Sequence, residues 1–398
     1  MANITGARAA YGYNVTTGNN DAQNEALDIS SMLDVLNPLR TPLLLRIGKD
    51  SLRDGCTSVK HEWLEDEVMG IYATTTDTDL NNTNTGSTTL TVASAEGYKF
   101  RGATNDYDGP QDIVRISSGA GEELARVISS TTTTVVVERG YNSVTPVDHT
   151  GYTTRTITIV GSAQIQGLTT VGASRTTTKA NVYNYTQIFE DSLTTSATNR
   201  ATKKFTMNDD VAYQTKNIVD RMANFMENAL LFGKRQALAL QDPGLMSGIR
   251  TYITTNVYNK SGVALTETHI NDALQAVWLA GADSKLLVCH PTQKRRIDTF
   301  LDGWRQMDYH DTRLGSFVSR WESNFGPLDI LMDQNMPDSE VLILDTDRIG
   351  FGPLRPLGMS PITPTSRESF TWQMTGEYTA EVRQEKSHAR IYGLSTTL

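Results

Sequence analysis

Cysteine is scarce in this sequence, and long apolar runs are absent. Among 398 residues only Cys56 and Cys289 occur, far apart and without a CxxC motif, so there is no disulfide framework. No apolar run approaches the roughly 20 residues that a membrane helix needs. The first residues, MANITGARAAYGYN, carry no signal-peptide pattern. We therefore expect the chain to be made in, and to stay in, a reducing cytoplasm.

Positive charge is also in short supply. The chain has 36 Lys and Arg against 45 Asp and Glu, which gives a net charge of −9. Tight, sequence-specific binding of nucleic acid needs a basic surface that displaces counterions from phosphates. The basic clusters, at 203–204 and 294–296, are short and lie near acidic residues. The charge balance therefore argues against a domain that reads DNA sequence.

Motifs for catalysis, phosphate binding and metal binding are missing as well. The six histidines are scattered, and neither HExxH nor a paired CxxC is present. There is no GxSxG elbow, no GxxxxGK[ST] loop and no GxGxxG after a predicted strand. The stretch 117–123 predicts a hairpin turn, and 105–112 lacks the ligand alternation of a calcium loop. We predict no enzyme, no cofactor and no metal site.

Threonine, in contrast, is abundant in a β-rich segment. Between about 88 and 160, several short strands alternate with turn residues, at spacings that suit a small barrel or sandwich. Threonine suits the exposed faces of such strands. The flanking segments, 57–73 and 163–190, also show strand patterns and are expected to pair with each other. The β domain would then be an insertion between the two limbs of one extended loop.

Helical spacing begins at residue 206. Apolar residues recur 7, 4, 3, 4 and 3 positions apart and predict one helix over about 207–233, which is long for a globular protein. We expect this stripe to form core rather than a subunit interface. The stripe consists of Val211, Ile218, Met222, Phe225, Ala229 and Phe232.

The remaining sequence predicts a compact α/β unit followed by a β tail. A Pro- and Gly-rich passage, 350–364, is expected to mark a boundary before a two-stranded tail over 368–394. The predicted strands of the α/β unit are 285–289, 328–333 and 340–345, and its predicted helices are 269–279 and 291–301.

Two segments, SVKHEWLEDE (58–67) and VYNYTQIFEDSLTTSATNRATKKF (182–205), resemble tailed-bacteriophage major capsid proteins of the Hong Kong 97-like fold. The branch in question is similar to the major capsid protein of phage SU-ten. The likeness covers essentially the whole chain outside about 80–160. Further segments that resemble this branch are 36–48, 285–300, 326–337 and 376–394.

This resemblance implies an α+β Hong Kong 97-like capsid fold with an inserted small all-β barrel or sandwich domain. In the plain fold the extended loop is a bare hairpin, so the inserted domain is a departure from it. The implied parts are an N-terminal arm (1–55), an extended loop (56–80 and 160–180), the inserted β domain (81–159), a peripheral domain with a spine helix (181–245 and 366–398) and an axial domain (246–365).

The resemblance also implies a function. The chain would assemble through pentamers and hexamers into the icosahedral shell that encloses the double-stranded DNA of a tailed phage, in the bacterial host cytoplasm. Implied partners are other copies, DNA held non-specifically, and scaffold, portal and decoration proteins, but no membrane. The inserted domain would brace neighbouring subunits or receive a decoration protein. The expected inter-subunit residues are Leu33, Leu36, Leu39, Trp63, Leu64, Glu65, Arg295, Arg296 and Trp304.

Other classes of protein remain open on sequence alone. An encapsulin-like compartment is a variant of the same fold and would show a cargo-binding pocket. A phage tail or adhesin-like β protein would explain the Thr-rich domain, and a hydrolase with a β lid would need convergent catalytic groups. Trp63 and Trp304 could equally be packing residues, and Arg295 and Arg296 exposed helix charges.

Overall fold

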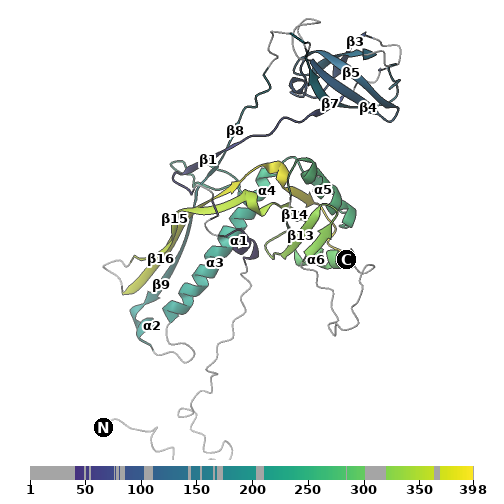
Figure 1. Cartoon of the computed structure of the whole chain (residues 1–398). Helices are drawn as coiled ribbons and strands as arrows, with labels where there is room; N and C mark the ends of the chain where they lie inside the picture. The colour runs from purple at the N-terminus through teal and green to yellow at the C-terminus, as the bar shows by residue number, and fades with distance from the viewer. Residues whose placement is uncertain are drawn as a thin grey trace, which may run out of the picture. The chain divides into compact units, whose positions relative to one another are not determined.

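The computed structural model of the chain separates into two compact units (Figure 1). The larger unit comprises Met1–Trp63 and Tyr183–Leu398, and the smaller one Leu64–Val182. Each unit has a hydrophobic core of its own. The structure describes residues 41–48, 51–52, 55–75, 77, 80, 86–102, 111–141, 145–152, 155–164, 166–167, 174–202, 210–283, 285–300, 320–362 and 368–397.

A long helix and a long antiparallel sheet form one half of the larger unit. Helix α3 runs over Asp210–Phe232, within the range predicted for it. It packs on the edge of a three-stranded sheet and runs along it (Figure 1). In sheet order, the strands are β15 (Ile349–Pro361), β16 (Ser369–Val382) and β9 (Gln187–Ser196).

The buried face of α3 differs in part from the predicted stripe. Ile218, Met222, Met226 and Leu230 are buried, each four residues after the one before. Because each residue turns an α-helix by about 100°, steps of four advance the buried face by about 40° each time. Phe225, which the predicted stripe included, lies off this advancing face and is 45% exposed.

A six-stranded mixed sheet forms the other half of the larger unit. Its strand order is β10-β17-β14-β11-β13-β12, with β10 parallel to β17 and β11 parallel to β13. The central strands β11 and β14 are buried at every position, as expected of apolar runs covered on both faces. The strands are β10 (Val257–Asn259), β11 (Leu286–Cys289), β12 (Arg320–Ser323), β13 (Gly326–Met332), β14 (Val341–Leu344) and β17 (Ala389–Tyr392).

Helices α5 (Glu267–Leu279) and α6 (Pro291–Phe300) belong to this half and match the sequence prediction. The hydroxyl of Thr266 accepts a hydrogen bond from the backbone N–H of His269 and so caps α5. Both helices turn apolar side chains toward the sheet. The short helices are α1 (Pro42–Ile47), α2 (Ala197–Ala201) and α4 (Ile249–Tyr252), with 3-10 turns η2 (Gly97–Lys99), η4 (Thr346–Arg348) and η5 (Glu385–Ser387).

The C-terminal strands do not pair with each other as the sequence predicts. Strand β16 lies in the three-stranded sheet, whereas β17 lies between β10 and β14 in the six-stranded sheet. The amide of Asn256 donates to the carbonyls of Lys386 and His388 and fixes the turn between the two strands. Alternating apolar residues in β17 are compatible with either sheet, so the periodicity could not distinguish them.

Strand β15 occupies the Pro- and Gly-rich passage that the sequence predicts as a boundary. It is an edge strand of the three-stranded sheet, and its pairing with β16 shifts register between Pro353 and Arg355 and again before Gly358. Proline cannot donate to a sheet ladder and is therefore confined to edges and bulges. Strand β15 offers both, so its prolines do not prevent a strand from forming.

The smaller unit is a closed antiparallel barrel rather than a sandwich. Its strand order is β2-β7-β4-β5-β6-β3, and a bridge between Thr75 and Val92 joins the first strand to the last. Closure removes the free sheet edges. The first strand lies inside 56–80, the range predicted as loop. The strands are β2 (Tyr72–Thr75), β3 (Gly86–Thr91), β4 (Gln111–Ser118), β5 (Gly121–Ser130), β6 (Thr134–Arg139) and β7 (Arg155–Ala163).

The predicted pairing of 57–73 with 163–190 is confirmed over two strands. Strand β1 (Lys60–Glu65) and strand β8 (Ala180–Tyr185) form a two-stranded sheet, and the boundary between the units falls within both. The N–H of Thr186 donates to the carbonyl of Val59 at 2.9 Å next to this ladder. These strands are therefore the two places where the chain passes between the units.

Candidate functional site

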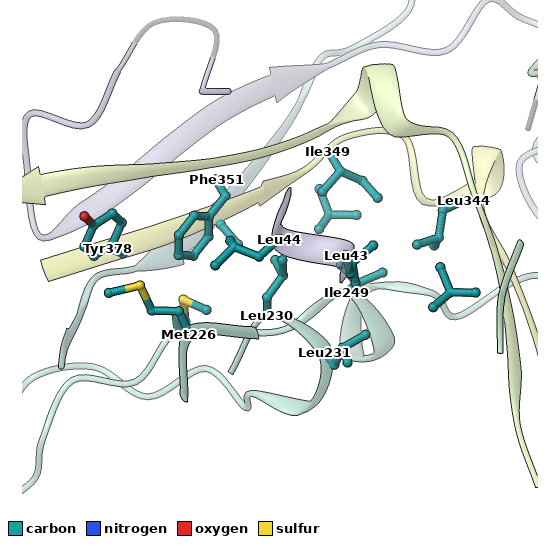
Figure 2. Packing of buried hydrophobic residues seen from close by; sticks show 14 of the residues in the cluster. Leu43, Leu44, Met226, Leu230, Leu231, Ile249, Leu344, Ile349, Phe351 and Tyr378 are labelled. Atoms are coloured by element: carbon teal, nitrogen blue, oxygen red, sulfur yellow. The ribbon is translucent and has the colours of Figure 1, made fainter. Parts of the chain in front are cut away.

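Helix α1 is seated in the core of the larger unit. Leu43 and Leu44 are 0% and 3% exposed. Figure 2 shows them among Leu230 of α3, Ile249 of α4 and Phe351 of β15. Burying a leucine side chain stabilises a fold by about 1.5–3 kcal/mol. The N-terminal segment therefore contributes directly to the packing between α3 and the two sheets.

Local sequence sets the length of α1. Pro42 lies at its first position, where the missing N–H costs no helical hydrogen bond. Gly48 ends the helix with φ +90° and donates its N–H to the carbonyl of Leu44, a backbone conformation that glycine adopts without strain. The guanidinium of Arg46 donates to the carboxylate of Asp329 at 2.6 Å and ties the exposed side of α1 to β13.

Two buried acidic side chains meet beside α1. Glu227 of α3 and Asp333, which follows β13, are both 0% exposed, and the side-chain amide of Asn335 donates to Glu227 Oε1 at 3.5 Å. Glu227 Oε2 also accepts the backbone N–H of Leu44 at 3.1 Å. Asp333 Oδ1 accepts the backbone N–H of Asn335 at 2.8 Å. Three elements that are distant in sequence thus meet at one pair of carboxyl groups.

Burial dominates the electrostatics of this pair. Burial, reinforced by the neighbouring charge of Asp333, raises the pKa of Glu227 to about 8. Burial also raises the pKa of Asp333, while its hydrogen bonds from Asn335 and Glu227 act in the opposite direction. The pair titrates as a unit, and it holds one proton well above the ordinary range of carboxylic acids.

The expected interface residues near β1 lie on opposite sides of the strand. Trp63 is 8% exposed, and its ring lies 5.9 Å from that of Tyr252. Leu64, the next residue, is 68% exposed, and Glu65 is partly exposed. Successive strand residues point to opposite faces. Trp63 therefore packs within its own unit, and Leu64 is available to another molecule.

Helix α6 carries two of the expected arginines, with different surroundings. Arg295 is exposed. Arg296 donates a hydrogen bond to the carbonyl of Thr397 and so holds the C-terminal segment. The remaining expected interface residues, Leu33, Leu36, Leu39 and Trp304, lie outside the described residues.

Exposed apolar side chains outside the set of expected interface residues lie at two places. At the end of α5, Trp278 and Leu279 are 55% and 61% exposed, and the ring of Trp278 lies 6.4 Å from that of Phe325. In the smaller unit, Val68 and Ile71 are 98% and 60% exposed. Adjacent exposed apolar residues at a helix end are a signal of protein contact, but helical periodicity alone could not show their exposure.

The barrel contains a serine, a histidine and a glutamate in series. The hydroxyl of Ser118 lies 2.7 Å from His149 Nδ1, and His149 Nε2 lies 3.7 Å from Glu123. His149 has no exposed surface, burial lowers its pKa, and Glu123 is held by the guanidinium of Arg139. The series therefore fixes the loop that contains His149 to the barrel wall.

Among the residues that the structure describes, no group of three or more His, Cys, Asp and Glu side chains is arranged to hold a metal ion. Nor does any helix in the described part of the chain have the length and apolarity to cross a membrane. Cys289 is buried, which raises the pKa of its thiol to about 12.

Comparison with known proteins identifies a family. A family model described as SU10 major capsid protein matches residues 11–395. The search of curated proteins found no match. The structure is similar to the capsid of a native GTA particle, with 9% sequence identity and a TM-score of 0.50, over 98% of this chain and 100% of that one.

Two further solved structures show weaker likeness. The capsid of cyanophage A-1(L) matches with 11% identity and a TM-score of 0.46, over 60% of this chain and 85% of that one. The SrpI encapsulin complex of Synechococcus elongatus PCC 7942 matches with 9% identity and a TM-score of 0.42, over 56% of this chain and 79% of that one.

Proposed function

Since this chain belongs to the SU10 major capsid protein family and is a tailed-phage major capsid protein with the Hong Kong 97-like fold, we propose that it assembles through pentamers and hexamers into an icosahedral shell around double-stranded DNA. The family match over residues 11–395 carries this proposal. Membership implies a shell of many copies in the virion. We place its assembly in the host cytoplasm and assign the chain no enzymatic activity.

We propose a separate role in the shell for each part of the chain. The axial domain would contain most of the six-stranded sheet, with the exposed end of α5 in contact with the next subunit of a ring. Head-to-tail contact of this kind closes into rings when the rotation permits. The proposed parts are the arm (1–55), the extended loop (56–80 and 160–180), the inserted domain (81–159), the peripheral domain (181–245 and 366–398) and the axial domain (246–365).

The proposed partners are DNA, other phage proteins and further copies of the chain, and the net charge of the protein bears on the first of these. With a net charge of −9, the protein offers no basic surplus to bind phosphates, so we propose that the shell encloses DNA without specific contacts. Scaffold, portal and decoration proteins are the other proposed partners. The proposed subunit contacts are Leu64, Glu65 and Arg295, which are exposed or partly exposed, together with Leu33, Leu36, Leu39, Arg296 and Trp304, while Trp63 would act by packing behind Leu64.

Sedimentation velocity at several concentrations, with negative-stain imaging of the heaviest fraction, tests the shell. We expect pentamers, hexamers or closed shells, because large interfaces repeated over many copies give a stable container. A monomer whose size does not change with concentration would contradict the proposal. Shells filled only with protein cargo, and never with DNA in infected cells, would favour an encapsulin-like compartment instead.

We propose that the inserted barrel braces neighbouring subunits or receives a decoration protein. A loop tip tolerates a whole inserted domain because the pairing at its base is unaffected. Deleting 72–163, which removes strands β2 to β7, with a short Gly-Ser linker in their place, should leave a subunit that folds but gives shells that rupture at lower temperature. Deleted shells that melt like the wild type would exclude the bracing role.

Substitutions at Trp63 and Leu64 should separate folding from assembly. Trp63→Ala removes a buried ring that packs on Tyr252 and should lower the stability of the subunit by about 3–5 kcal/mol. Leu64→Ser changes a side chain that is 68% exposed and should leave subunit stability within about 0.5 kcal/mol. Thermal melting of subunits and the yield of shells measure the two effects. The proposed interface at Leu64 is contradicted if Leu64→Ser shells form as efficiently as wild-type shells.

A further inference from the structure

The loop between α3 and α4 presents two leucines to solvent. Leu238 and Leu240 are 60% and 102% exposed. Two backbone hydrogen bonds between Gln236 and Leu245, each of 3.1 Å, close the base of this loop, which we call the α3–α4 loop (237–244). An exposed apolar group at the tip of a closed loop is a signal of contact with another molecule.

Local contacts fix the shape of the α3–α4 loop. The N–H of Ala239 donates to the carbonyl of Asp242 at 3.1 Å, across the tip. Pro243 follows and fixes its own φ angle. Gly244 lies against Thr186, between β8 and β9, because a Cβ at this glycine would be only 3.1 Å from the Thr186 carbonyl oxygen. The tip therefore has a defined shape before a partner binds, which lowers the entropic cost of binding.

A pocket of about 430 Å³ lies on another part of the larger unit, between α1, the segment before β11 and the turn from β12 into β13. Phe325, Gly326 and Pro327, at this turn, form its apolar wall. Pockets of about 300–1,000 Å³ are the size in which proteins enclose compact groups. None of the lining residues belongs to the α3–α4 loop, so one chain has both a projection and a separate recess.

Charged side chains line the rest of the pocket. They are Arg46, Asp283, Lys285, Arg320 and Asp329. Asp329 accepts a hydrogen bond from Arg46 at 2.6 Å, and Lys285 is paired with Asp347. Arg320 lies opposite Asp329 across the β12–β13 ladder, but among the described residues it forms no ion pair. Arg320 is therefore the cation of the pocket that an incoming carboxylate can bind.

The tip of the α3–α4 loop is complementary to this pocket. Leu240 is an apolar group without cover, and Phe325 and Pro327 form an apolar wall that can cover it. Asp242, two residues further on, is exposed and is the single charged residue of the loop. Its carboxylate matches the unpaired guanidinium of Arg320 in sign. Because Leu240 is fully exposed, the loop does not fill the pocket of its own chain.

We propose that the tip of the α3–α4 loop of one subunit inserts into this pocket of the next subunit. Leu240 packs on Phe325 there, and Asp242 pairs with Arg320. The inference rests on the proposed function and names the partner surface of the ring contact at the end of α5. Trp278 borders this surface, because its ring lies 6.4 Å from that of Phe325. Since loop and pocket are different surfaces, the contact is head to tail and can close into a ring.

Reversing the two charges in the full-length chain tests the contact. Asp242→Arg or Arg320→Glu alone brings like charges together and should raise the protein concentration needed for assembly by about tenfold or more. The double variant restores opposite charges and should need a concentration within about threefold of the wild type. Sedimentation velocity measures assembly, and thermal melting of unassembled subunits reports folding. A defect caused by misfolding would be largest in the double variant, which is the opposite of the expected order.

Cross-linking tests the geometry independently of charge. Leu240→Cys is combined with Pro327→Cys in a Cys56→Ser background, which leaves Cys289 as a buried native thiol. A short bismaleimide should join neighbouring chains head to tail, giving a ladder on denaturing gels that ends at the size of the ring. Each single-cysteine variant should remain a monomer on the same gels. Dimers of the Leu240→Cys variant alone would show a self-complementary contact and would overturn the head-to-tail insertion.

The remaining outcomes separate the contact from the shell. Rings or shells without the link between positions 240 and 327 would refute the contact and leave the shell intact. Linked rings that never close into shells would refute the shell and leave the contact intact. A link from position 327 to the N-terminal arm, or to another protein, would show a different occupant of the pocket and overturn the inference. A monomer at every concentration would refute both.

Discussion

Glu123→Ala should unfold the inserted barrel while the rest of the chain stays folded. Glu123 and Arg139 have side chains that are 1% and 0% exposed and are joined by two hydrogen bonds, of 2.6 and 3.2 Å. The alanine variant leaves the guanidinium of Arg139 buried without its counterion. Removing one partner of a buried ion pair typically costs about 3–5 kcal/mol.

The loss extends to the loop that the ion pair holds. Glu123 also accepts the N–H of Val147 at 2.9 Å, and Arg139 donates to the Val147 carbonyl at 2.7 Å. The pair thus satisfies both backbone groups of a residue in the loop next to His149. Val147 is only partly buried, so losing its partner there adds less than the roughly 1–3 kcal/mol of a fully buried group. We therefore expect the barrel to lose most of its stability in this variant.

Calorimetry of the full-length protein measures this effect. The transition assigned to the barrel should fall by more than about 12 °C, while the other transition stays in place. Glu122→Ala is the matched control, because Glu122 is the neighbouring residue and forms only an exposed pair with Arg115 at 3.2 Å. That variant should change stability by less than about 0.5 kcal/mol. Equal melting of the two variants would show that the buried ion pair does not stabilise the barrel.

Leu230→Ala should destabilise the larger unit and prevent shell formation at physiological temperature. Leu230 is 0% exposed and belongs, with Leu43 and Phe351, to the buried cluster that Figure 2 draws. Truncating a fully buried leucine costs about 2–5 kcal/mol, because both transfer energy and packing are lost. A single domain is typically stable by only about 5–15 kcal/mol.

The control for this variant lies on the same helix. Phe225→Ala truncates a larger side chain, but Phe225 is 45% exposed, so the subunit should lose less than about 1 kcal/mol. Thermal melting of the subunits compares the two, and electron microscopy counts the shells. If Phe225→Ala destabilises the isolated subunit as much as Leu230→Ala does, the rotation of the buried face along α3 is not as described.

Helices and central strands were predictable from sequence because each has a local signal. The strands of the barrel, strands β11 and β14, and helices α3 and α5 all combine apolar periodicity or apolar runs with turn residues at their ends. Strand β15 was missed because its prolines predict a break, and only the position of a strand at a sheet edge makes them tolerable. The sheet to which β17 belongs depends on long-range pairing that periodicity does not encode.

The functional features were less predictable than the fold. A glutamate inside an apolar stripe, such as Glu227, is a weak signal of burial, but its partner could not be identified. Asp333 lies far away in sequence. It comes close to Glu227 because β13 pairs with β11, and β11 shares a buried cluster with α3. Strand alternation predicts that Trp63 and Leu64 point to opposite faces of β1. Which of the two is buried is known only from the packing of Trp63 on Tyr252.

The prolines of β15 have a consequence for a protein that accumulates in many copies before a container closes. An open sheet edge invites the same edge of another molecule, and stacked edges grow into fibres. Strand β15 has such an edge within the described residues: Ser51 covers it at Phe351, and Pro353, Pro356 and Pro361 lie along the rest. Each proline removes a donor that a second edge would need. We therefore expect these prolines to disfavour edge-to-edge association of free subunits.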